Sequence, residues 1–181
     1  MARSDQLRGR TGHTNRSGRP SSSRSYNHSL RLLGNNDDEA FRLNQIAAES
    51  GMHDAVLAMG WFYLNGVGVK ASEHEALRWY RKSARQGDEK AMFSLGQIAY
   101  FAGDYSEAIV WFKRAANKGH DRSDFWIGKM YWRGQGITQD RQEANKYFSR
   151  AADKKVFEAQ RTVRYLAFLA RHRSLGLRST S

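Results

Sequence analysis

Residues 55–87 read AVLAMGWFYLNGVGVKASEHEALRWYRKSARQG, and parts of this stretch recur along the chain. The second half starts at Ala76, and an Ala stands in register at Ala40, Ala108 and Ala144. The first half contains Gly60, and a Gly stands in register at Gly96 and Gly128. Internal similarity with a period of about 36 residues indicates stacked structural units, each of which is one supersecondary element.

The repeated units are predicted to be helical. Apolar residues within 52–64 and 76–84 recur at three- and four-residue steps, which gives each segment one apolar face. Capping pairs precede three of the segments, namely Ser72 with Glu75, Asp104 with Glu107, and Asp140 with Glu143. Glycines close several segments, with Lys155 at the equivalent place in the last one. The sequence therefore predicts eight helices, at 38–50, 53–65, 73–86, 88–101, 105–118, 121–132, 140–153 and 156–172.

Small residues recur where neighbouring helices would have to approach closely, and aromatic residues recur between them. The small set comprises Gly60, Gly96, Gly128, Ala84, Ala116 and Ala152. A single helix pair cannot cover its own apolar face, so stacked neighbours bury one continuous core. The sequence predicts an all-α fold, a right-handed α-solenoid of antiparallel helix pairs that resembles the tetratricopeptide superhelix.

The middle repeat is shorter than the others. Residues 95–116 read LGQIAYFAGDYSEAIVWFKRAA and lack the Gly-x-Gly segment found at 66–68 and 134–136. We place this deletion between helices, where it leaves the packed layers in register. The Gly-x-Gly segments are interpreted as turns, because no strand precedes them and they lack the further Gly and Lys of a phosphate-binding loop.

Charge is concentrated at the two ends of this 181-residue chain, whose formal net charge is +12. Residues 1–36 hold seven Arg and one acid, and residues 161–181 hold five Arg and no acid. The N-terminal segment is too poor in apolar residues to offset the entropy of ordering it. We expect a disordered basic tail over 1–36 and a disordered tail over 173–181. Between them, 37–172 is predicted to form three full repeats with a half repeat at each end.

The repeat pattern resembles a known family. The copies AVLAMGWFYLNGVGV…ALRWYRKSARQG at 55–87 and DFWIGKMYWRGQGI…ANKYFSRAADKK at 124–155 look like the Sel-one-like repeat, a relative of the tetratricopeptide repeat. The resemblance spans about 38–170, and the middle copy departs from it at the missing Gly-x-Gly. It implies a protein-interaction scaffold rather than an enzyme.

The sequence offers no residues arranged for catalysis. The six His are scattered without metal-ligand spacing, there is no Cys, and acid pairs fall in first helical turns, where the helix dipole favours them. We therefore expect no catalytic residue, no cofactor and no metal. Because no run of about 18 apolar residues and no secretory signal is present, we expect a cytoplasmic protein.

The first helix of each pair carries a stripe of aromatic and long polar residues at three- and four-residue steps, which we place on the concave wall. Flat rings beside long polar groups suit a peptide groove, although the same rings could pack against the next repeat. Trp61, Tyr100 and Trp132 are the residues we expect to be exposed. The candidate partner-binding residues are Leu57, Trp61, Leu64, Phe93, Gln97, Tyr100, Phe101, Phe125, Lys129, Trp132, Arg161 and Tyr165.

Two functions remain open at this point. The first is a non-enzymatic, monomeric scaffold that binds a peptide or protein on its concave surface. The alternative is a basic-tailed adaptor whose Arg-rich ends contact nucleic acid or an anionic surface. The amphipathic last helix is interpreted as a cap of the solenoid, with a partner or membrane-surface role as the alternative.

Overall fold

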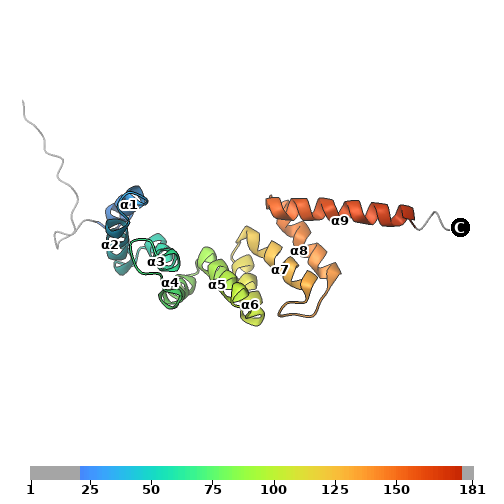
Figure 1. Cartoon of the computed structure of the whole chain (residues 1–181), viewed down its shortest axis with the longest axis horizontal. Helices are drawn as coiled ribbons and strands as arrows, with labels where there is room; N and C mark the ends of the chain where they lie inside the picture. Colours follow the sequence, from blue (N-terminus) through green and yellow to red (C-terminus); the bar gives the residue numbers. More distant parts are fainter. Residues whose placement is uncertain (1–20, 177–181) are drawn as a thin grey trace, which may run out of the picture. The chain divides into compact units, whose positions relative to one another are not determined.

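The structure, a computed structural model, describes residues 21–176, with side chains up to Arg171. This part of the chain contains nine helices and no strand, which confirms the all-α prediction. Along the chain, α5 and α6 lie side by side, as do α7 and α8 (Figure 1). The helices are α1 (Ser22–Leu32), α2 (Asp37–Glu49), α3 (His53–Asn65), α4 (Glu73–Arg85), α5 (Glu89–Phe101), α6 (Tyr105–Asn117), α7 (Asp121–Arg133), α8 (Arg141–Asp153) and α9 (Phe157–Gly176).

Local signals place the helix ends. The Asp104 side chain accepts a hydrogen bond from the backbone N–H of Glu107, and Asp140 accepts from those of Gln142 and Glu143, as the capping pairs predict. Asp88 caps α5 in the same way, a cap that the sequence interpretation missed. Each of these carboxylates satisfies backbone donors that the helix itself leaves unpaired.

The chain divides into two compact units, one ending at Glu73 and the other beginning at His74. In the N-terminal unit, α1 packs against α2. Ser25 and Ser29 of α1 are buried, and the Ser29 hydroxyl donates to the carbonyl of Ala40 over 2.7 Å. The prediction that residues 1–36 are disordered is therefore wrong for Ser22–Leu32; residues 1–20 lie outside the described part of the chain. The first helix pair is complete rather than half a repeat.

In the C-terminal unit, the repeat glycines receive an aromatic ring from the second helix of their own pair. A Cβ on Gly96 would lie 2.7 Å from Cδ1 of Phe112, and a Cβ on Gly128 would lie 2.7 Å from Cδ1 of Phe148. Real Cβ atoms do not approach other atoms so closely, because van der Waals repulsion is steep at that distance. The recurring Gly is thus the residue that allows each hairpin to close.

The Gly-x-Gly turn after α7 joins neighbouring hairpins. Gly134 ends α7 in the left-handed conformation, with φ of 67°. Gly136 has φ of 66° and lies so close to the first turn of α6 that a Cβ there would overlap the carbonyl group of Tyr105. The predicted turn is therefore confirmed, and its second glycine serves backbone packing between repeats.

The last helix extends further than predicted. It ends at Gly176 rather than 172, so the predicted disorder of 173–181 is wrong for 173–176, and residues 177–181 lie outside the described part. Val156 and Ala159 pack with Ala151 of α8. At the position of the repeat glycine, α9 carries an exposed Arg164.

Lys155 follows α8 with φ of 62°, where the equivalent residue after α6 is Gly119, with φ of 96°. We expect Lys155→Gly to raise the free energy of unfolding by about 1 kcal/mol, because the left-handed conformation costs an L-residue roughly 1–2 kcal/mol and the greater freedom of an unfolded Gly offsets part of that gain. Urea denaturation measures the change. Gly119→Ala is the matched reverse substitution and should destabilise; an unchanged midpoint for Lys155→Gly would contradict the expectation.

No helix in the described part of the chain has the length and apolar character needed to cross a membrane.

Candidate functional site

The predicted partner-binding residues of α3 lie in the N-terminal unit. Trp61 is 43% exposed and Leu64 is also exposed, whereas Leu57 is half-buried. The Trp61 indole meets the ring of Phe62 edge-to-face, with the ring centres 5.5 Å apart. The expectation that Trp61 is exposed is thus confirmed.

On α5, two of the predicted residues are part of the core. Phe93 is buried and stacks on the imidazole of His120 at 4.1 Å, and Tyr100 is only 8% exposed. The Tyr100 hydroxyl donates to Oε1 of Gln135 over 2.9 Å and accepts from Nη1 of Arg133. The expectation that Tyr100 is exposed is wrong, because residues of the following hairpin cover it. Of the other two predicted residues on α5, Gln97 is half-buried and Phe101 is exposed.

The remaining five predicted residues come together between α7 and α9. Two adjoining pockets, of about 290 and 540 Å³, share Phe125, Thr162 and Tyr165 in their walls. We call this surface the α7–α9 groove. It is lined by Phe125, Lys129, Trp132 and Arg133 of α7, Phe148 of α8, and Glu158, Arg161, Thr162, Arg164, Tyr165 and Leu166 of α9.

Sequence reasoning missed several groove residues, chiefly on α9. Glu158, Thr162 and Leu166 follow one another at four-residue steps and therefore share one helix face. A count from Glu158 along that face would have found them. Phe148 of α8 is buried and also lines the smaller pocket.

Lys129 lies among three aromatic rings. Its Nζ lies 4.1 Å from the centre of the Trp126 ring, and the rings of Tyr100 and Phe125 lie within 6 Å. Burial, and then the nearby positive charge of Arg133, lower the pKa of Lys129. Aromatic faces thus replace part of the water that a surface ammonium group would have.

An ion-pair cluster joins α7 to α8 and to the residue that follows it. Asp124 is fully buried, with its carboxylate oxygens 3.2 Å from Nη2 of Arg150 and 3.1 Å from Nζ of Lys154. Because Arg150 lies on α8 and Lys154 directly follows its last residue, this buried carboxylate fixes one helix of the pair against the other. We assign it a structural role, since removing one partner from a buried pair leaves an uncompensated charge.

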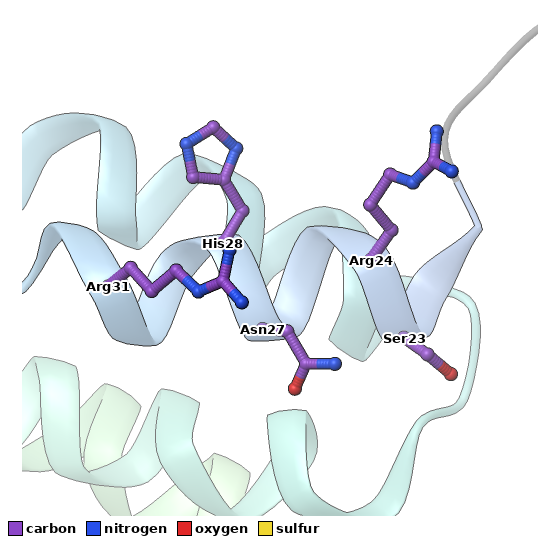
Figure 2. Close-up of a pocket in the computed structure, with 5 residues that line it drawn as sticks. All are labelled: Ser23, Arg24, Asn27, His28 and Arg31. Carbon is purple, nitrogen blue, oxygen red and sulfur yellow. The ribbon is translucent and has the colours of Figure 1, made fainter. Parts of the chain in front are cut away.

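A second depression, of about 550 Å³, lies on α1. Its described lining comprises Ser23, Arg24, Asn27, His28 and Arg31, all from one helix. Figure 2 shows these side chains leaving α1 in different directions, with His28 and Asn27 on opposite sides. They do not converge on one point. Most Arg residues of the predicted basic tail lie outside the described part of the chain, so the tail-binding alternative stays a prediction.

Burial of the imidazole lowers the pKa of His120, despite the opposing charges of Glu89 and Asp121. The unfolded chain therefore binds a proton near the ordinary pKa of about 6.5, where the folded chain does not. We expect this contribution to stability to be present above that pH and to be lost progressively as the pH falls through it, toward the lower pKa of the folded chain. Thermal melts across this range measure the slope. His120→Gln should flatten it, and a slope that stays unchanged in this variant would contradict the expectation.

Helical hairpins that recur along the chain, each with a small residue where its two helices meet, define a helical-repeat protein. The Sel1 repeat family matches residues 24–52, 53–88, 89–120 and 122–156, and the chain belongs to this family. Repeats of this kind serve as protein-interaction scaffolds, and their fold is typically non-catalytic. The four matches include α1, which confirms that the first pair is a full repeat.

Solved structures carry the same fold. A Sel1 repeat protein from Oxalobacter formigenes superposes with a TM-score of 0.74 at 28% identity, over 82% of this chain and 64% of that one. A protective antigen of uropathogenic Escherichia coli with the same repeat fold gives a TM-score of 0.72 at 25% identity, over 80% and 33%. These similarities confirm the predicted α-solenoid class.

Two longer proteins share a segment with the chain. Chitin synthase regulator SKT5 of Malassezia restricta is 34% identical over 68 residues, which is 38% of this chain and 5% of that protein. The ERAD-associated E3 ubiquitin-protein ligase component HRD3A of Arabidopsis thaliana is 31% identical over 70 residues, 38% of this chain and 10% of that protein. The chain thus spans a tenth or less of these relatives.

Within the residues that the structure describes, no cluster of three or more His, Cys, Asp or Glu is arranged to hold a metal ion.

Proposed function

We propose that the protein is a non-enzymatic interaction scaffold that holds a peptide segment of a partner protein in the α7–α9 groove. The observation that carries this proposal is the convergence of Phe125, Lys129, Trp132, Arg161 and Tyr165 on two adjoining pockets. Family membership supports the general role, and the groove supports this location for it.

The side chains of the groove suit a peptide. Tyr165 is 61% exposed, whereas Trp132 is half-buried rather than exposed as expected; both rings line the groove and offer contact area. Aromatic residues and Arg dominate the energetics of protein interfaces. Aromatic rings bury large areas with little loss of side-chain freedom, and Arg adds charge-assisted hydrogen bonds. Apart from Phe148 of α8, the side chains that line it belong to α7 and α9.

Photocrosslinking tests the location. With p-benzoylphenylalanine in place of Tyr165, we expect a discrete adduct with a partner protein in extract of the native cell. The matched control places the same group at Phe157, which is 66% exposed on the same helix but outside the groove. Adding Trp132→Ala should lower the adduct yield about fivefold or more, since losing an aromatic interface residue costs over about 1 kcal/mol. Circular dichroism verifies that the variant remains helical.

Equal adduct patterns at positions 165 and 157 would contradict the proposal, because a selective groove must distinguish two exposed positions of one helix. A Trp132→Ala variant that stays folded and crosslinks as well as the parent would also contradict it.

A further inference from the structure

The charge of the α7–α9 groove is strongly one-sided. Four cations line it, namely Lys129, Arg133, Arg161 and Arg164, and among the described lining residues Glu158 is the single acid. Oε1 of Glu158 is 2.7 Å from Nη2 of Arg122, a residue outside the groove. A backbone hydrogen bond and then Arg122 lower the pKa of Glu158, which keeps this carboxylate charged and engaged. The positive charge within the groove is thus left largely uncompensated.

The neutral contacts of these cations do not cancel their charge. Arg133 donates to the hydroxyl of Tyr100, and the guanidinium of Arg161 lies 5.7 Å from the centre of the Phe157 ring. Both contacts orient a cation without neutralising it. An incoming carboxylate would gain charge-assisted hydrogen bonds that these neutral groups cannot supply.

The two pockets differ in character. The smaller one has Trp132, Phe148 and Leu166 in its wall, and its volume of about 290 Å³ lies at the lower limit of small-molecule sites, which start at about 300 Å³. It has room for a large apolar side chain. The larger pocket carries Arg161 and Arg164 beside it. A segment that fits both has an apolar residue next to acidic ones.

The partially desolvated Lys129 strengthens the preference for an acid. Burial disfavours the charged form of this ammonium group, and a carboxylate placed beside it restores that form. Since Lys129 lines the smaller pocket, the acidic residue of the occupant should directly neighbour the apolar one.

The termini of a second copy of this chain are poor occupants. Residues 1–36 carry seven Arg and one acid, and residues 161–181 carry five Arg and no acid. Like charges placed together in a groove repel each other. Residues 1–36 and 161–181 of a second copy therefore do not match the charge of the groove, and we take the occupant to be a segment of a partner protein.

We infer that the α7–α9 groove selects an acidic peptide segment in which a large apolar residue is flanked by Asp or Glu. The apolar side chain occupies the pocket of Trp132, Phe148 and Leu166, and the carboxylates face Lys129, Arg161 and Arg164. This inference rests on the proposed function and adds the chemistry of the partner to it.

Selection from a random twelve-residue peptide library, displayed on phage and panned against the full chain, tests the inference. We expect enriched peptides to carry net negative charge and at least one Phe, Trp, Leu or Met. In fluorescence anisotropy, the isosteric peptide with Asn and Gln in place of Asp and Glu should bind at least about fivefold more weakly. The double substitution Arg161→Gln with Arg164→Gln should weaken binding of the acidic peptide by a similar factor, since each exposed ion pair contributes modestly to the binding free energy. Arg81→Gln with Arg85→Gln on α4 is the control of equal charge change.

The outcomes separate the inference from the function on which it rests. Neutral or basic enriched peptides that lose binding with Tyr165→Ala would overturn the acidic preference and leave the groove as a peptide site. Enriched peptides that bind the Tyr165→Ala and Trp132→Ala variants as well as the parent would overturn the groove itself. If the α4 control pair weakened binding of the acidic peptide equally, the preference would reflect the overall charge of the chain rather than the groove. That result would overturn the inference. The absence of any enriched peptide would overturn both proposals.

Discussion

Phe112→Ala should lower the free energy of unfolding of the C-terminal unit by about 3–5 kcal/mol, the usual range for removing a buried Phe. Phe112 is fully buried, it covers Gly96, and its ring stacks on Trp126 with the centres 5.5 Å apart. Gly96 has no side chain that could move into the space, so we expect much of the cavity to remain. The expected loss is comparable to the whole stability of many domains, about 5–15 kcal/mol.

Phe101→Ala is the matched control, since it makes the same chemical change on α5 at a side chain that is 74% exposed. Its expected effect is within about 0.5 kcal/mol, as for surface substitutions in general. Urea denaturation followed by circular dichroism measures both variants. Similar midpoints for the two would show that the core of this unit does not depend on the ring that fills the repeat glycine.

The second large effect is expected for Gly136→Ala. The left-handed conformation costs an Ala roughly 1–2 kcal/mol, and overlap with the Tyr105 carbonyl adds roughly 1–3 kcal/mol, since neither backbone segment can rotate away as a side chain would. The sum is about 2–5 kcal/mol. Thermal denaturation of the purified variant provides the measurement.

Gly134→Ala separates the two contributions. Gly134 has nearly the same φ as Gly136, but a Cβ there would meet the Cβ of Gln139 at 3.2 Å, a side-chain contact that can adjust. We expect this variant to show mainly the conformational cost of roughly 1–2 kcal/mol. If both variants lost equal stability, the close approach between the turn and α6 would contribute nothing.

Most of the fold could be predicted because its signals are local. Periodic apolar residues, acidic caps such as Asp104 and closing glycines determine each helix within its own segment, and the predicted ends fall within a few residues of those observed. The exception is α1. It has few apolar residues, and it is held in part by a buried serine that bonds to a carbonyl of α2, a tertiary contact that composition does not reveal.

The groove could be predicted only in part, since repeat-equivalent positions do not have equivalent surroundings. Tyr100 and Trp132 stand at corresponding places, yet Tyr100 is covered by Gln135 from the turn of the next hairpin. Phe93 is likewise covered by His120, which precedes α7. The last helix, α9, stands where the first helix of a pair would stand, and among the described residues no turn of a following hairpin covers it. Tyr165 on this helix therefore stays accessible.

The contact between Gly136 and Tyr105 also bears on the order in which the hairpins form. The turn after α7 packs on the first residue of α6. The α5–α6 hairpin must therefore form before the α7–α8 hairpin can pack against it. Chains are made from the N-terminus, at about 5–20 residues per second, far more slowly than helical hairpins form. We therefore expect this unit to assemble vectorially during synthesis, each hairpin serving as the template for the next.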